Sequence, residues 1–241
     1  MAHLLHSSFL GSRFPSSSLF VPTSQRRRMC LLSRATLTST PPLTLRYNKL
    51  GDSDLLISEV TLGTMTWGNQ NTEKEAHEQL SYAFDNGVNI FDTAEMYPVP
   101  VSKEKQGNTD RIINPWLKTR PRDKVIIATK VAGFSTNETS LRDNSKGTRV
   151  DAANIKESVE KSLKRLGTDY IDLLQIHWPD RYVPLFGEYM YDLSKWRESV
   201  PFSEQLQALH DVIKEGKVHV VSISYAFIKF MNRISSMNKA S

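Results

Sequence analysis

Short apolar runs rich in β-branched residues alternate with segments of helical apolar spacing from about residue 44 onward. A hairpin is predicted first, with strands over residues 44–49 and 55–58 around a turn at 51–53. Further strands are expected at 60–64, 88–91, 124–129, 170–176 and 218–224. Helices are expected between them, at 72–87, 109–117, 154–166 and 203–215. This order is typical of repeated βα units with a parallel sheet, which an eightfold barrel and a doubly wound sheet share.

Local signals mark the ends of these helices. Thr72 and Glu75 form a capping-box pattern, in which the threonine accepts from the amide three residues on while the glutamate reaches back. Gly87 and Gly167 stand where left-handed residues commonly end a helix. The apolar face expected for the last helix consists of Leu206, Leu209, Val212 and Ile213.

Polar residues are concentrated where the predicted strands end. Four segments share this position: Leu62–Gly68, Phe91–Tyr97, Ala128–Lys130 and Leu174–Pro179. Barrels and open α/β sheets build their sites at the carboxyl ends of parallel strands. We therefore expect these segments to contribute to one site.

Taken together, these segments resemble the aldo-keto reductase family. Residues 92–97 read D-T-A-E-M-Y, residues 128–130 read A-T-K and residues 176–179 read I-H-W-P, in the family's order. The resemblance covers residues 44 to about 224, and residues 96–100 with the loop at 106–107 are similar to the Tas-like branch, which has plant and bacterial members. It implies an α/β fold of the (β/α)8 TIM-barrel family and an extended nicotinamide cofactor, usually NADPH, bound without a Rossmann domain or a metal.

The activity implied is NADP(H)-dependent reduction of aldehydes or ketones to alcohols, with the catalytic residues Asp92, Tyr97, Lys130 and His177. Hydride delivery to a carbonyl carbon leaves negative charge on the oxygen, which a positioned acid must protonate. Tyr97 is expected to be that acid, because the Lys130 ammonium would favour its phenolate while Asp92 holds the ammonium. His177 would donate to the carbonyl oxygen. Each residue also has a structural reading, as a loop cap, a surface aromatic, a solvated strand end or a hydrogen-bonded histidine, but one site accounts for all of them.

Cofactor and substrate contacts are expected at the same strand ends. By resemblance, the residues that face the cofactor are Gly63, Thr64, Asp92 and Ser224. A glycine at this position would let the ligand approach the backbone closely. Trp67 and Trp178 are expected to flank the pocket mouth, although packing at its rim is an equally good interpretation. The aromatic residues of segment 182–199 suggest that the substrate is a hydrophobic carbonyl compound.

The net charge of +5 is located in the first 40 residues. They hold five arginines and no acidic residue, and taking these five from 31 basic residues leaves 26, equal to the 26 acidic residues. A basic face for nucleic acid is therefore not expected. No apolar run approaches the ~18 residues of a membrane span. The partner that the resemblance implies is a small-molecule carbonyl compound, and the oligomeric state stays open.

Residues 1–40 are predicted to be a transit peptide, because they are rich in arginine and serine and free of acidic residues. The alternative is a tail without a targeting role. The serine excess and the opening Met1-Ala2 favour the chloroplast over the mitochondrion or the cytoplasm. Removal of this segment would take away Cys30, the single cysteine, so disulfides and thiol chemistry are not expected in the mature chain.

The resemblance ends after the fifth predicted strand. Ser224 matches the first residue of the family's Ser-Asn pair, which holds the nicotinamide carboxamide, but Tyr225 replaces the asparagine. Residues 41–224 are interpreted as a partial reductase domain of about five βα units, truncated after the fifth strand, and residues 225–241 as a divergent tail. Because an open set of strands would leave sheet edges unpaired, a catalytically inactive truncated isoform or a regulatory binding protein is the alternative to an enzyme.

Overall fold

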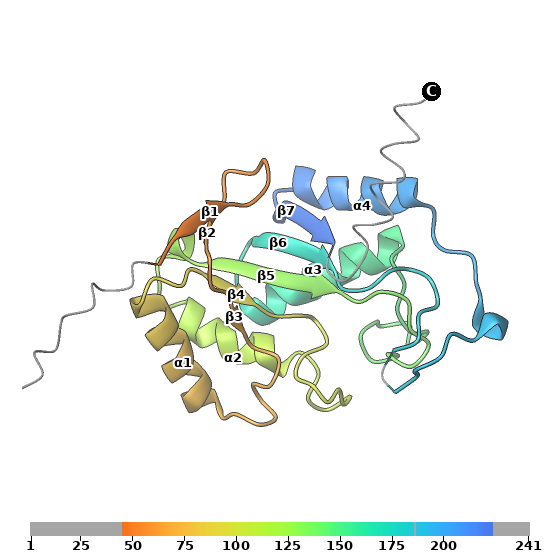
Figure 1. Cartoon of the computed structure of the whole chain (residues 1–241), viewed down its shortest axis with the longest axis horizontal. Coiled ribbons are helices and arrows are strands. Elements are labelled where there is room, and N and C mark those ends of the chain that lie inside the picture. Colours follow the sequence, from red (N-terminus) through yellow and green to blue (C-terminus); the bar gives the residue numbers. More distant parts are fainter. Residues whose placement is uncertain (1–44, 186, 224–241) are drawn as a thin grey trace, which may run out of the picture. The chain divides into compact units, whose positions relative to one another are not determined.

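The computed structural model describes residues 45–185 and 187–223 (Figure 1). The predicted transit peptide over 1–40, Ser224 and the tail over 225–241 lie outside the described residues and stay predictions. Within the described part, no helix is both long and apolar enough to cross a membrane.

A two-stranded hairpin precedes the main sheet, as the sequence predicts. Its strands β1 (Tyr47–Lys49) and β2 (Leu56–Ser58) pair antiparallel. Asn89, just before the second strand of the main sheet, holds the hairpin in place: its side chain accepts from the Ser58 amide at 2.8 Å and donates to the Leu56 carbonyl at 2.8 Å. The hairpin is thereby fixed to the end of the sheet at which the strands begin.

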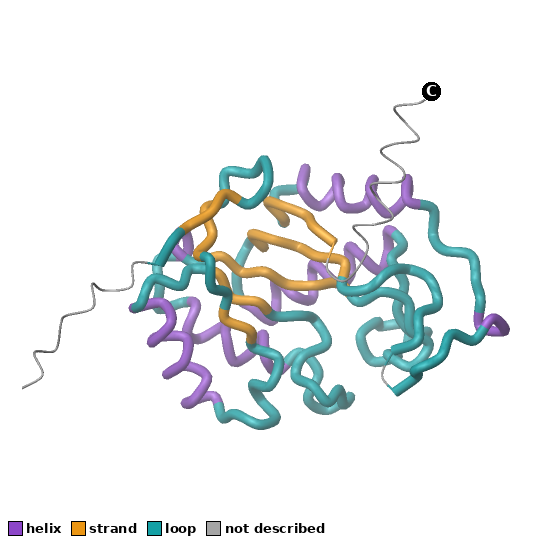
Figure 2. The backbone as a smooth tube through the Cα atoms, in the orientation of Figure 1, coloured by secondary structure: helices purple, strands orange, loops and turns teal. Residues whose placement is uncertain are grey.

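The main sheet has five parallel strands in chain order, which confirms the predicted βα repeat. They are β3 (Leu62–Gly63), β4 (Ile90–Asp92), β5 (Ile126–Val131), β6 (Ile171–Ile176) and β7 (Val218–Ile223). Each strand pairs with the next one along the chain. Doubly wound sheets instead reverse their strand order at a switch point, so the barrel-type alternative is the one that the structure shows. The strands lie side by side in Figure 2.

Successive residues of β5 face opposite sides of the sheet, as the strand period requires. Ile127 packs in a cluster with residues of the first two helices. Ile126 and Ala128 instead join an inner cluster with Leu50 and Ile57 of the hairpin region. The helices therefore cover one face of the sheet, and the hairpin covers the start of the other.

Helices α1 (Glu73–Asp85), α2 (Asn108–Leu117), α3 (Ala152–Leu166) and α4 (Phe202–Lys214) connect the strands, with short 3-10 helices at Arg122–Lys124 and Leu193–Lys195. The predicted capping box is confirmed. The Thr72 hydroxyl accepts from the Glu75 amide at 3.3 Å, and the Glu75 carboxylate accepts from the Thr72 amide at 2.8 Å. Gly87 has a φ of 92°, which turns the chain so that the next amide, of Val88, donates back to the Ala83 carbonyl at 2.9 Å and ends α1.

The buried face of α4 shares Leu209 and Val212 with the predicted one but differs at its other positions. It consists of Gln205, Ala208, Leu209 and Val212. Leu206 is 53% exposed, so its predicted place in the core is wrong. Gln205 lies inward instead, because its side-chain amide donates to the Val200 carbonyl at 2.7 Å and so remains satisfied when buried.

Candidate active site

Four polar side chains lie together where β4, β5 and β6 end. Asp92 is the last residue of β4, Lys130 lies near the end of β5, and His177 follows β6. The Lys130 ammonium forms an ion pair with Asp92 and donates to the Thr93 carbonyl at 2.8 Å. Tyr97, in the β4–α2 connection, has its ring centroid 5.1 Å from Lys130 Nζ and 5.9 Å from the centroid of the His177 ring. The structure thus brings the four predicted residues into one contiguous group.

Backbone hydrogen bonds continue past the strand ends and fix this group. The Glu95 amide donates to the Lys130 carbonyl at 3.3 Å, and the His177 amide donates to the Val131 carbonyl at 2.9 Å. These bonds prolong the parallel ladder into the loops. The connections that carry Tyr97 and His177 therefore leave the sheet in a fixed register with β5.

Gln175 also belongs to the group, and sequence reasoning misses it. It pairs in register with Lys130, and its side-chain amide donates to Asp92 Oδ2 at 3.3 Å. Asp92 therefore accepts from an ammonium and from an amide. The available signal is a single polar residue within the otherwise apolar end of β6, where the strand reads LLQI.

Burial and charge set the ionisation of Lys130 and Tyr97. Burial lowers the pKa of Lys130, while the Asp92 carboxylate acts in the opposite direction. Burial, and then the charge of Asp92, raises the pKa of Tyr97 to about 12. The sequence argument expects Lys130 to favour the phenolate. The net shift of the Tyr97 pKa is opposite to this expectation, because burial and the charge of Asp92, which pairs with the ammonium, both oppose ionisation of Tyr97.

The His177 imidazole is neutral near pH 7. Burial, and then the positive charge of Lys130, lowers its pKa to about 4, although the Glu95 carboxylate acts in the opposite direction. Its Nδ1 is buried without a hydrogen-bond partner among the described residues. A neutral imidazole keeps one N–H donor, so His177 can donate to an oxygen without carrying charge.

The low pKa of His177 predicts a pH-dependent contribution to stability. An unfolded histidine titrates at about 6.5 and the folded His177 at about 4, so between these values only the unfolded chain binds the proton. Stability from this group should fall as the pH drops through this window, by on the order of 3 kcal/mol in all. Urea unfolding at pH 5 and pH 7 measures the slope. His177→Asn should flatten it, and an unchanged slope would contradict a buried neutral imidazole.

The two predicted pocket tryptophans occupy different places. Trp178 packs in the cluster that contains Tyr97, and its ring is tilted against His177 with centroids 5.0 Å apart. Trp67 is 1% exposed, and its indole donates to Gln79 of α1 at 3.1 Å. The structure therefore places Trp67 in the core rather than at a pocket mouth, because its ring packs under α1 and α2 on the helix-covered face.

Gly63 and Thr64 lie at the end of β3 beside Asp92. Gly63 pairs with Asp92 in the sheet, and the Thr64 hydroxyl donates to the Asp92 carbonyl at 2.8 Å. A Cβ atom added to Gly63 would meet no atom of the described residues within 4 Å, apart from its chain neighbours. Packing among the described residues therefore gives no reason for a glycine here, whereas close approach of a ligand to the backbone does.

Comparison with known proteins agrees with this geometry. Residues 59–241 match the model of the aldo/keto reductase family. Protein tas of Escherichia coli is 43% identical over 185 residues, which cover 75% of this chain and 52% of that protein. Aldo-keto reductase YhdN of Bacillus subtilis is 33% identical over 193 residues, covering 78% and 49%.

Solved structures show the same likeness. The holo form of aldo-keto reductase AKR11C1 from Bacillus halodurans has a TM-score of 0.54 and 29% identity, over 75% of this chain and 50% of that one. The chain spans about half the length of the relatives it matches. It belongs to the aldo/keto reductase family, and its parallel sheet of five strands is part of that family's (β/α)8 barrel.

Proposed function

We propose that this protein is an NADPH-dependent carbonyl reductase that converts aldehydes or ketones to alcohols. The observation that carries the proposal is the contiguous group of Asp92, Lys130, Tyr97 and His177 at the carboxyl ends of parallel strands. The group contains two uncharged donors, the Tyr97 phenol and the His177 imidazole, whose rings meet edge to face. Donors held in place before the reaction stabilise the charge that develops on a carbonyl oxygen.

A bound nicotinamide cofactor supplies the hydride, and the residues of the chain manage the proton and the charge. Tyr97 donates its proton to the carbonyl oxygen. Because its pKa is about 12, the phenol is protonated at neutral pH before each turnover. The Lys130 ammonium, 5.1 Å from the ring centroid, stabilises the phenolate that remains. Asp92 holds that ammonium, and Gln175 holds Asp92.

The ends of β3 and β4 fit the nicotinamide part of such a cofactor. Gly63 leaves its backbone open on the exposed side, and Thr64 and Asp92 are tied to each other beside it. The choice of NADPH follows the family's usual cofactor. These three residues would hold the nicotinamide next to Tyr97.

A hydrophobic carbonyl compound is the substrate class that the neighbouring cavity favours. This cavity of about 400 Å³ lies between the loops after β5 and β6. Phe134, Tyr182, Val183 and Leu185 form its apolar part, and its remaining lining is polar, with Glu188, Lys195 and Arg197 among it. Val183 and Leu185 also pack against the cluster that contains Tyr97. Because aromatic and aliphatic side chains bind apolar groups, this apolar part of the cavity suits the hydrophobic part of an aldehyde or ketone.

Fluorescence titration with NADPH tests the proposal directly. The chain of 241 residues should bind NADPH, and Gly63→Ala should weaken the binding by about tenfold, because a methyl group would stand where the cofactor approaches. The same variant should leave the free energy of unfolding within about 0.5 kcal/mol of wild type. No binding at millimolar NADPH would refute the proposal for this chain, and equal affinities would refute the contact at β3.

A further inference from the structure

A buried ion pair lies next to the group formed by Asp92, Tyr97, Lys130 and His177. The side chains of Glu95 and Arg142 are fully buried, and two guanidinium nitrogens donate to the carboxylate at 2.8 and 3.0 Å. Glu95 stands between Asp92 and Tyr97 in the chain. We infer that Glu95 and Arg142 are positioning residues that hold Tyr97 and the end of β5 in register. The inference rests on the proposed reductase function.

The Glu95 carboxylate connects several parts of the chain. Besides Arg142, it accepts from the Ala132 amide at 2.6 Å and from the Ser158 hydroxyl of α3 at 2.7 Å. Burial alone would raise the pKa of Glu95, but the Arg142 charge and the other donors hold it below its usual range. The carboxylate is thus ionised, and the hydrogen bonds from Arg142, Ala132 and Ser158 together fix its position.

Ala132 makes this position relevant to catalysis. It lies two residues after Lys130, directly beyond the end of β5. The amide of Glu95 also donates to the Lys130 carbonyl. The main chain of Glu95 therefore binds the residue before Val131, and its side chain binds the residue after it. The Val131 carbonyl in turn accepts from the His177 amide at 2.9 Å. Displacing Glu95 would therefore disturb Lys130, His177 and the connection to Tyr97 together.

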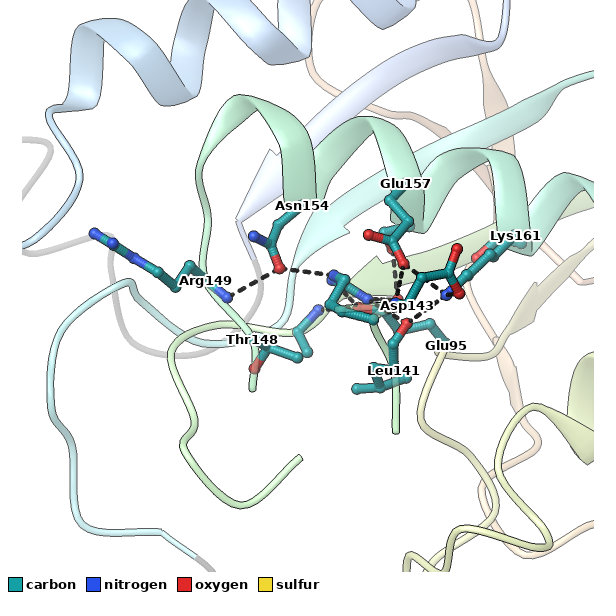
Figure 3. A network of polar contacts seen from close by, with 12 residues as sticks. Glu95, Leu141, Asp143, Thr148, Arg149, Asn154, Glu157 and Lys161 are labelled. Atoms are coloured by element: carbon teal, nitrogen blue, oxygen red, sulfur yellow. Dashed lines mark hydrogen bonds and ion pairs between the residues drawn. The ribbon is translucent and has the colours of Figure 1, made fainter. Parts of the chain in front are cut away.

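Arg142 extends the same arrangement to the β5–α3 loop. Its Nε donates to Asn154 of α3 at 2.7 Å, and its Nη1 also contacts the Leu141 carbonyl at 3.2 Å. The Leu141 side chain packs in the cluster that contains Tyr97. Figure 3 shows Glu95, Leu141 and Asn154, which come from three different segments of the chain, in one network of polar contacts. The guanidinium therefore holds the backbone of Leu141, whose side chain belongs to the same cluster as Tyr97.

Stability alone does not account for a charged pair at this place. Replacing a buried ion pair by well-packed apolar residues is often neutral or stabilising, because desolvation offsets the attraction. What a bidentate arginine–carboxylate pair adds is direction, since two parallel hydrogen bonds fix the relative orientation of the groups. That property matters most next to residues whose geometry decides a reaction rate.

A second ion pair at the opposite end of β5 provides a matched control. Asp172 accepts from the Ile127 amide of β5 at 2.9 Å and from Arg122 at 2.7 Å. It therefore has the same kinds of partner as Glu95, a backbone amide of β5 and an arginine. It lies where the strands begin, away from the group around Tyr97.

Comparing Glu95→Gln with Asp172→Asn in the full chain tests the inference. Both changes keep the side-chain shape and remove a carboxylate from an arginine, so both should lower stability in urea. Only Glu95→Gln should lower kcat for aldehyde reduction, by about 10- to 100-fold, because small misplacements of reacting groups have effects of this size. The Kd for NADPH should change by less than about twofold. Ser158→Ala removes one donor and keeps the ion pair, and should give a smaller loss in the same direction if Glu95→Gln does not fold.

A spectroscopic readout makes the test independent of turnover. In chain labelled with 3-fluorotyrosine, the ¹⁹F signal of Tyr97 is assigned by its loss in Tyr97→Phe. It should shift or broaden in Glu95→Gln and in Ser158→Ala but not in Asp172→Asn. If the wild type shows no turnover, the proposed function fails while this signal still decides whether Glu95 positions Tyr97. An unmoved signal in both Glu95→Gln and Ser158→Ala, or an equal loss of kcat in Asp172→Asn, would overturn the inference.

Discussion

Tyr97→Phe is expected to lower kcat for aldehyde reduction by about 10²- to 10⁴-fold, the usual contribution of a positioned general acid. The phenyl ring can keep the packing of Tyr97 against Trp178 and Leu141, so the free energy of unfolding and the Kd for NADPH should stay close to wild type. Steady-state kinetics with a hydrophobic aldehyde, together with NADPH titration, measures both quantities.

The large size of this effect follows from the ionisation of the neighbours. His177, with a pKa of about 4, carries no dissociable imidazolium proton at neutral pH. The Lys130 ammonium is directed toward Asp92 and the Thr93 carbonyl. In the proposed mechanism Tyr97 is therefore the proton source, and we expect neither neighbour to take its place.

Tyr170→Phe is the matched control for this experiment. Tyr170 stacks on His219 beside the start of β6, with ring centroids 4.4 Å apart. Removal of its hydroxyl should leave kcat within about twofold of wild type. Substantial turnover by Tyr97→Phe, under conditions in which Tyr170→Phe is fully active, would show that Tyr97 is not the acid.

The order and type of the elements could be predicted from the sequence because buried apolar residues recur at spacings that differ between helices and strands. The strand predicted at 170–176 is observed at Ile171–Ile176, and the helix predicted at 154–166 is observed at Ala152–Leu166. Boundaries are less determined where a strand end faces solvent. The strand predicted at 60–64 contains only Leu62–Gly63, since Val60 is exposed and only two residues pair with β4.

Site residues could be predicted where the type of residue and its position at a strand end point to the same chemistry. Asp92, Lys130 and His177 meet both conditions. Gln175 and Glu95 do not, because their roles depend on partners in neighbouring strands and loops that no local pattern reveals. The raised pKa of Tyr97 is likewise a property of the assembled group, in which burial and Asp92 outweigh the nearby ammonium.

Trp67 shows the same limit for apolar residues. A strand-end tryptophan can lie at a pocket or beneath a helix, and its sequence position is the same in both cases. Here the hydrogen bond to Gln79 and the packing under α1 show that the Trp67 side chain lies in the core. The direction of a side chain that follows a two-residue strand is set by the helices that pack on it.

Gly133→Ala should have the largest effect on stability among single-methyl changes near the site. Gly133 is buried one residue after Ala132, beyond the end of β5. A Cβ atom there would overlap the carbonyl oxygen of Trp178 and would lie 2.6 Å from its carbonyl carbon. Both are backbone atoms, which cannot move aside by rotating a side chain.

The surroundings leave little room for the loops to separate. The Phe134 amide donates to the Pro179 carbonyl at 3.2 Å, and the Trp178 indole donates to the Phe134 carbonyl at 2.9 Å. The Gly133 carbonyl accepts from the Thr148 hydroxyl at 2.6 Å. An added methyl group must therefore push the loop after β5 away from the end of β6 and break some of these bonds. We expect a loss of about 3 kcal/mol, near the upper end for overpacking.

The same displacement should reach catalysis, because Trp178 follows His177 directly. We expect Gly133→Ala to lower kcat as well as the urea midpoint. Gly63→Ala should leave the midpoint unchanged, because its new methyl group meets no atom within 4 Å in the described part of the chain beyond its sequence neighbours. Urea unfolding of both variants beside wild type separates the two cases. If Gly133→Ala were as stable as wild type, the loops after β5 and β6 would not be in tight contact, and the fixed position of His177 would need another cause.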